Sequence, residues 1–151
     1  MAGEADFTPD EWQAIQKAVT VAGVLVAYAE GGRNDILDEV FAITQLLGAA
    51  RSDPNQLLRE AARMRFQPGI QPGMKYADYE APALEAIRTA VAAVLARSPG
   101  DVAVFRAFLV KLAEAAANAH KEGGFAGVGG TRVSPAEAVA IARVKQAAGI
   151  P

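Results

Sequence analysis

The chain has 151 residues, of which 52% are hydrophobic and 21% charged, with a formal net charge of −2 at pH 7 and no cysteine. This composition excludes an intrinsically disordered chain, and the length suits one folded domain, so residues 1–151 are treated as a single domain. Disulfides, thiolate nucleophiles and cysteine-bound zinc are excluded as well.

The distribution of charge and hydropathy argues against two classes of partner. The 15 Lys and Arg residues are spread among 17 Asp and Glu residues, which leaves no basic patch for nucleic acid. The longest apolar stretch, Ala18 to Ala29, is shorter than the ~20 residues that cross a bilayer. Met1 to Asp6 carries acids where a signal peptide carries Lys or Arg. We therefore expect a cytoplasmic protein that binds neither nucleic acid nor membrane.

The first predicted helix begins at Thr8-Pro9-Asp10-Glu11, a capping box, and ends near Glu30-Gly31-Gly32. Its apolar residues leave only a narrow polar stripe, which indicates a buried, central helix. The stripe consists of Gln13, Gln16, Lys17 and Thr20.

A second helix is predicted from about Asp35 to Ala50, with an inner stripe at helical spacing. The stripe consists of Ile36, Leu37, Val40, Phe41, Thr44, Leu47 and Gly48. Ser52-Asp53-Pro54 then predicts a short third helix, which turns Leu57, Leu58, Ala61 and Ala62 inward.

Residues 66–78 contain Pro68-Gly69 and Pro72-Gly73 and are expected to be an irregular connection. A fourth helix follows, roughly from Glu80 to Arg97, and its apolar stripe consists of Leu84, Ile87, Val91, Val94 and Leu95.

A fifth helix is predicted to open at Ser98-Pro99-Gly100-Asp101 and to end at Glu122-Gly123-Gly124. It has a narrow polar stripe and is expected to be central, like the first. A Gly-rich loop over residues 123–132 precedes a second capping box, Ser134 to Glu137, which opens the last helix to about Ala148. No segment alternates as a strand would, so the fold class is all-α, a bundle of about six helices.

The two ends of the chain are similar to one another. The first and fifth helices each begin at a Thr-Pro or Ser-Pro step, end in Glu-Gly-Gly, and precede a shorter capped helix. This pattern suggests two pseudo-symmetric helical hairpins around two central buried helices. The alternative is that Ala-rich helices ending in Gly resemble one another by chance.

Residues that nucleophilic catalysis requires are scarce. His120 is the one histidine, and its position in the last turn of the fifth helix favours a role at the helix dipole. Ser52, Ser98 and Ser134 each stand where a helix cap is expected. The Gly-rich loop follows a helix rather than a strand and lacks the Gly-Lys-Ser/Thr ending of a phosphate loop. We therefore favour a protein that is not an enzyme, with no catalytic residues assigned.

Acidic residues gather around the first interhelical loop, at Glu30, Asp35, Asp38 and Glu39. Carboxylate oxygens are the ligands that hard divalent cations prefer, so these four residues are a candidate metal site, and a divalent metal is the candidate cofactor. The structural alternative is that acids in a first helical turn are a general preference.

The steps Glu30-Gly31 before Ile36, and Glu122-Gly123 before Val133, Ser134 and Glu137, resemble the TerB-like (tellurite-resistance) family. The resemblance implies a compact helical bundle with pseudo-two-fold symmetry. Because some members carry clustered acids proposed to bind a divalent metal, it also places Glu30, Glu122 and Glu137 on acidic positions of the family.

Three functions follow as hypotheses. The first is a non-enzymatic bundle that acts through protein contacts, with itself or another protein, in a stress-related assembly. Its contact surface would be Met64, Phe66, Met74, Tyr76 and Tyr79, which could alternatively cover the bundle's own open end. The second is a metal-binding module or metal-dependent enzyme, and the third is a binder of small apolar ligands in a cavity beside the Ala-rich and Gly-rich central helices.

Overall fold

The computed structural model describes residues 2–29, 36–123 and 133–150. Within these residues the chain forms six α-helices and two short 3-10 helices, and no strand, so the expected all-α class is confirmed. The helices are η1 (Glu4–Asp6), α1 (Pro9–Ala29), α2 (Ile36–Ala50), α3 (Gln56–Ala61), α4 (Tyr76–Arg97), η2 (Pro99–Asp101), α5 (Val102–Gly123) and α6 (Pro135–Ala147).

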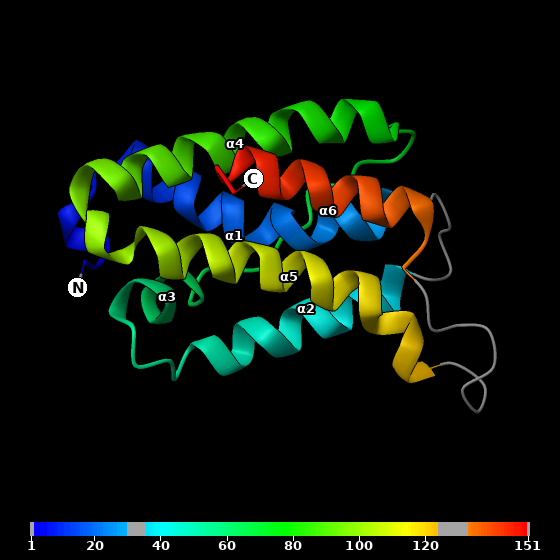
Figure 1. The fold of residues 1–151 in the computed structure, drawn as a ribbon, viewed down its shortest axis with the longest axis horizontal. Coiled ribbons are helices and arrows are strands. Elements are labelled where there is room, and N and C mark those ends of the chain that lie inside the picture. Colours follow the sequence, from blue (N-terminus) through cyan, green and yellow to red (C-terminus); the bar gives the residue numbers. More distant parts are fainter. Residues whose placement is uncertain (1, 30–35, 124–132, 151) are drawn as a thin grey trace.

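Helices α1 and α5 run side by side in the same direction, and α2, α4 and α6 run the opposite way around them (Figure 1). Each of the two contacts all of the other five α-helices. Their core positions are fully buried, among them Ile15 and Leu25 in α1 and Phe105 and Leu112 in α5. The prediction of two central helices is confirmed, although α5 also has an exposed side, which includes Val104 and Lys111.

Local capping explains where α1 and α6 begin. The Thr8 hydroxyl accepts a hydrogen bond from the Glu11 amide at 3.2 Å, and the Glu11 carboxylate accepts one from the Thr8 amide at 2.8 Å. Ser134 and Glu137 repeat this exchange at 3.1 and 3.0 Å. Each pair satisfies two backbone donors that a helix start leaves without partners. Both predicted capping boxes are therefore confirmed.

The orientation of α2 differs from the prediction. Leu37 and Phe41 were expected to face inward, but they are 73% and 61% exposed, and Gly48 is exposed as well. The buried face consists of Glu39, Ile43, Leu47 and Ala50, of which Leu47 belongs to the predicted stripe. Ile36, Val40 and Thr44 of that stripe are half-buried. Because α2 is apolar on nearly every side, hydrophobic periodicity cannot decide which side packs against α1 and α5.

Three other boundaries also differ. Helix α4 begins at Tyr76, four residues before the predicted start, because the Asp78 carboxylate accepts from the Lys75 amide at 3.3 Å. Helix α3 is capped by Asn55 rather than Ser52. The Ser98 hydroxyl donates to Asp101 at 2.7 Å instead of capping a helix. Of the three serines, only Ser134 caps with its side chain.

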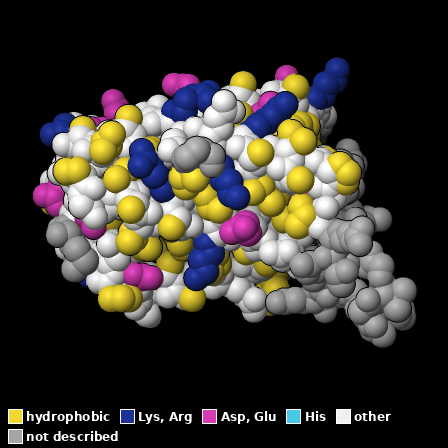
Figure 2. Space-filling view, in the orientation of Figure 1, with side chains coloured by type: hydrophobic (Ala, Val, Ile, Leu, Met, Phe, Trp, Pro, Cys, Tyr) yellow, Lys and Arg dark blue, Asp and Glu magenta, His cyan; other side chains and the backbone are white. Residues whose placement is uncertain are grey.

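The outer surface carries both signs of charge. Figure 2 shows basic and acidic side chains interspersed with hydrophobic ones over the face drawn. No α-helix among the described residues is both long enough and apolar enough to span a bilayer.

Candidate functional site

The polar stripe of α1 faces the connection between α3 and α4 and the first turns of α4. Gln13 and Lys17 are exposed, whereas Thr20 is buried. The Thr20 hydroxyl donates to the Gln16 carbonyl at 3.1 Å and lies 3.5 Å from the Met64 sulfur. The connection therefore contacts α1 at Met64 and leaves the rest of the stripe open.

Two tyrosines attach this connection to the bundle. The Tyr79 hydroxyl donates to the Pro68 carbonyl at 2.6 Å, and the Tyr28 hydroxyl donates to the Met74 carbonyl. The two rings meet edge to face, with centroids 5.8 Å apart. Burial raises the pKa of the Tyr79 hydroxyl well above its ordinary value, so this group remains a donor at physiological pH.

Two glycines of the connection have a backbone conformation that favours glycine, and Pro72-Gly73 forms a turn, closed by the Met74 amide donating to the Gln71 carbonyl at 3.0 Å. Gly69 and Gly73 have φ values of 80° and 79°, a left-handed conformation that glycine adopts without steric cost. The connection is attached to the bundle on both sides of this turn, at Pro68 and Met74.

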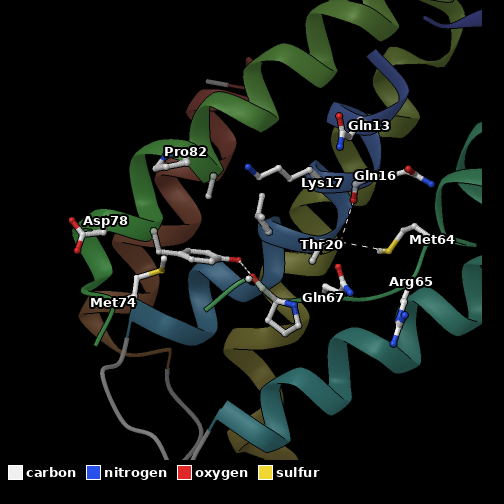
Figure 3. Close-up of a pocket in the computed structure, with 15 residues that line it drawn as sticks. Gln13, Gln16, Lys17, Thr20, Met64, Arg65, Gln67, Met74, Asp78 and Pro82 are labelled. Atoms are coloured by element: carbon white, nitrogen blue, oxygen red, sulfur yellow. Dashed lines mark hydrogen bonds between the residues drawn. The ribbon is translucent and has the colours of Figure 1, made fainter. Parts of the chain in front are cut away.

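A groove of about 570 Å³ lies between α1, the connection and the start of α4. In Figure 3, Gln13, Lys17 and Thr20 lie between Met64 on one side and Pro82 on the other, and the Lys17 side chain extends toward Pro82. We refer to this hollow as the α1–α4 groove. Its lining residues are Gln13, Gln16, Lys17, Thr20, Val21, Met64, Arg65, Gln67, Pro68, Gly69, Met74, Asp78, Tyr79, Pro82 and Ala83.

A second hollow, of about 480 Å³, continues the groove along the two helices. The two share Gln13, Lys17 and Pro82, so the hollows adjoin, and we refer to the pair as the trough. The second hollow is otherwise lined by Asp10, Ala14, Glu85, Ala86 and Thr89.

Charge is arranged unevenly along this trough. Lys17 and Arg65 line the first hollow, and neither forms an ion pair with any described residue. Asp10 and Glu85 line the second hollow together with Lys17, and Glu85 is paired with Arg88 at 3.2 Å. The Asp78 carboxylate points away from the groove in Figure 3. An occupant that carries a negative group close to Lys17 and Arg65 would match this arrangement.

Pro82 interrupts the regular backbone hydrogen bonding of α4 beside the groove. Proline has no N–H, so the regular helical hydrogen bond from residue 82 to the Asp78 carbonyl cannot form within α4. Both residues line the groove. A ligand N–H could therefore bind the Asp78 carbonyl, while the amides of Gln13, Gln16 and Gln67 can each donate and accept.

The predicted metal ligands are only partly described. Glu30 and Asp35 lie outside the described residues. Asp38 is exposed, whereas Glu39 on the next position of α2 is fully buried. Among the described residues no three metal-ligating side chains form a group that could hold an ion. A metal site completed by Glu30 and Asp35 stays a prediction.

The predicted contact surface mostly covers the bundle. Met64 and Tyr79 are buried, and Phe66, Met74 and Tyr76 are half-buried against the core. These side chains therefore cover the bundle, as the alternative interpretation of the sequence proposed, and Met64, Met74 and Tyr79 also line the groove.

The side chains of His120 and Glu122, and residues 124–132 of the Gly-rich loop, lie outside the described part of the chain.

Lys17, Arg65 and Pro82 were not identified as site residues from the sequence. The sequence feature that could have indicated the site is Pro82, which lies inside an otherwise helical segment. A proline inside a helix lowers stability, so its presence there points to a role other than stability.

Comparison with models of known protein families, with curated proteins and with solved structures gave no match.

Proposed function

We propose that this chain is a non-enzymatic binding module whose α1–α4 groove holds an extended segment of a partner protein. The observation that carries the proposal is the trough, in which two hollows of about 570 and 480 Å³ share Gln13, Lys17 and Pro82. A single hollow of this size suits one small molecule, whereas an adjoining pair suits a chain laid along it.

The chemistry of the lining supports a peptide as the occupant. A peptide presents alternating N–H and C=O groups, and the glutamine amides together with the Asp78 carbonyl offer partners for both. Met64, Met74 and Tyr79 supply adaptable apolar contacts. None of the described residues that line the groove carries an imidazole or thiol that could act as a catalytic base or nucleophile.

We also propose that the chain is related to the TerB-like helical bundles. This relationship is supported by the places of α2 and α6, which each follow a long central helix and each contact both α1 and α5. Two such helices on one central pair are what a duplicated hairpin would produce.

The proposal can be tested by selecting random linear peptides on the immobilised protein and measuring their affinities in solution. We expect selected peptides to bind at least about tenfold more weakly, a loss of about 1.4 kcal/mol, to Lys17→Glu and Arg65→Glu. The control Lys111→Glu makes the same charge change on an exposed position of α5, and binding should be unchanged. Failure to select any peptide, or equal binding to the groove variants and the wild type, would overturn the proposal.

A further inference from the structure

Helix α2 presents large apolar side chains to solvent. Leu37 and Phe41 are the two most exposed large hydrophobic residues among those described, at 73% and 61%. They lie one turn apart on the side of α2 opposite Glu39, Ile43 and Leu47. Exposed apolar side chains that are clustered in this way mark an interaction surface more often than isolated ones do.

Gly48 lies on the same line of α2, two turns beyond Phe41. A Cβ added at Gly48 would meet no atom within 4 Å, and its φ is not positive. Neither packing within the chain nor backbone conformation therefore requires glycine here, although glycine inside a helix is destabilising relative to alanine. Close approach by another molecule would account for it.

Gly23, unlike Gly48, is a helical glycine whose Cβ position is filled by neighbouring residues. A Cβ added there would lie 2.6 Å from the Ile43 side chain and 3.1 Å from the Leu112 carbonyl oxygen. That glycine is explained by α2 and α5 packing against α1. Gly48 has the same kind of helical position without such a neighbour.

A second copy of α2 would fill this space. If two α2 helices cross antiparallel about a two-fold axis that passes between Thr44 and Gln45, Phe41 of each copy lies over Gly48 of the other. A two-fold contact must be self-complementary, and a bulky residue paired with a gap two turns away on one helix face satisfies that requirement.

The charges of α2 are compatible with this pairing. No charged residue lies between Val40 and Ala50, so the crossing brings no like charges together. The two-fold axis sends the two exposed Asp38 residues to opposite ends of the contact, each level with the end of the partner helix that carries exposed Arg51. Each end of the contact between the two α2 helices then carries Asp38 of one copy and Arg51 of the other, which have opposite charges.

From these observations we propose that the chain forms a homodimer through α2, with Phe41 of each copy seated on Gly48 of the other. Helix α2 lies at the opposite edge of the bundle from α4 (Figure 1). The dimer would therefore leave the α1–α4 groove open, and its existence does not depend on what the groove binds.

The first test is the molar mass of the full chain as a function of concentration, from sedimentation equilibrium. The wild type should dimerise, and both Phe41→Lys and Gly48→Leu should raise the dissociation constant of the dimer at least tenfold. The control Leu95→Lys alters an exposed leucine of α4 and should leave the constant unchanged. Circular dichroism establishes that each variant is folded. A wild type that stays monomeric, or a control that weakens the dimer equally, would overturn the proposal.

Single cysteines test the register, because the chain contains none of its own. Gln45→Cys lies beside the proposed axis and should form a disulfide-linked dimer on mild oxidation, since close helix packing brings the two Cα atoms within disulfide range. Leu37→Cys lies far from the axis and should stay monomeric. Equal cross-linking of the two variants would exclude the antiparallel arrangement.

Discussion

Ile43 of α2 occupies the space that a side chain at Gly23 of α1 would need. A Cβ built on Gly23 would lie 2.6 Å from the Ile43 Cγ1 atom and 2.7 Å from its Cδ1 atom. Both residues are buried, and this contact fixes how closely α2 approaches the centre of the bundle. Ile43 can therefore occupy this space only because Gly23 has no side chain.

We expect Gly23→Ala to lower the free energy of unfolding by about 1–3 kcal/mol, because overpacking in a close-packed core outweighs the helix propensity gained from alanine. Chemical denaturation followed by circular dichroism measures the change. The control is Gly100→Ala, because an added Cβ at Gly100 meets no atom within 4 Å. If Gly23→Ala stabilised the protein as an exposed helical substitution would, the close approach of Ile43 would be wrong.

The buried carboxylate of Asp101, which accepts a hydrogen bond from the Ala2 amide, makes the stability of the fold depend on pH in the acid range. Burial alone would raise the pKa of Asp101, but donors on Ser98, the Ala2 amide and Asn55 outweigh it and hold the pKa below its ordinary value. These donors lie 2.7, 2.9 and 3.1 Å from the carboxylate.

We expect Asp101→Asn to lower the free energy of unfolding at neutral pH by about 1–3 kcal/mol, the range for buried hydrogen bonds to a charged group. A lowered pKa means that the ionised carboxylate stabilises the fold above its unfolded pKa of about 4, and that this contribution is lost as the pH falls through the folded value. The difference between wild type and variant should therefore narrow below about pH 4. A constant difference from pH 7 to pH 2 would contradict this assignment.

Much of the fold could be predicted because its signals are local. Thr8 and Ser134 lie three residues before Glu11 and Glu137, and such pairs specify a helix start without reference to the rest of the chain. The central position of α1 also follows from its own residues, since its second half has no polar side to expose.

Other features could not be predicted because tertiary contacts decide them. Burial of Glu39 and exposure of Phe41 show that α2 is rotated about its axis from the expected orientation. Periodicity cannot fix this rotation in a helix that is apolar on nearly every side. The α1–α4 groove combines Lys17, Arg65 and Pro82 from three separate segments. No spacing in the sequence places these residues together.

The capping box of α6 offers a test of how burial affects a local motif. Glu137 is 1% exposed, whereas Glu11, its counterpart at the start of α1, is partly exposed. Ser134→Ala should lower the free energy of unfolding by about 1–2 kcal/mol, and Thr8→Ala should lower it by less, because water can replace the lost partner only at the more exposed site. Equal losses in denaturation experiments would contradict the role of burial.

Burial of Tyr79 predicts a loss of stability at alkaline pH. A raised pKa in the folded state means that the protonated phenol contributes stability below the unfolded pKa of about 10, and that this contribution falls as the pH rises beyond it. Tyr79→Phe removes the hydrogen bond to the Pro68 carbonyl and should destabilise the protein near pH 7. Above pH 10 the difference from wild type should shrink, which thermal unfolding across this pH range would reveal.

A substitution at Pro82 should change the free energy of unfolding and the affinity for peptides in opposite directions. Pro82→Ala supplies the N–H that α4 lacks and should raise the free energy of unfolding by up to about 3 kcal/mol. The same N–H would occupy the Asp78 carbonyl, so peptides selected on the wild type should bind more weakly to the variant. Denaturation and solution binding measured on one preparation give both quantities. Higher stability with unchanged affinity would remove the Asp78 carbonyl from the binding site, because a ligand that uses this acceptor must bind more weakly once the amide introduced at position 82 occupies it.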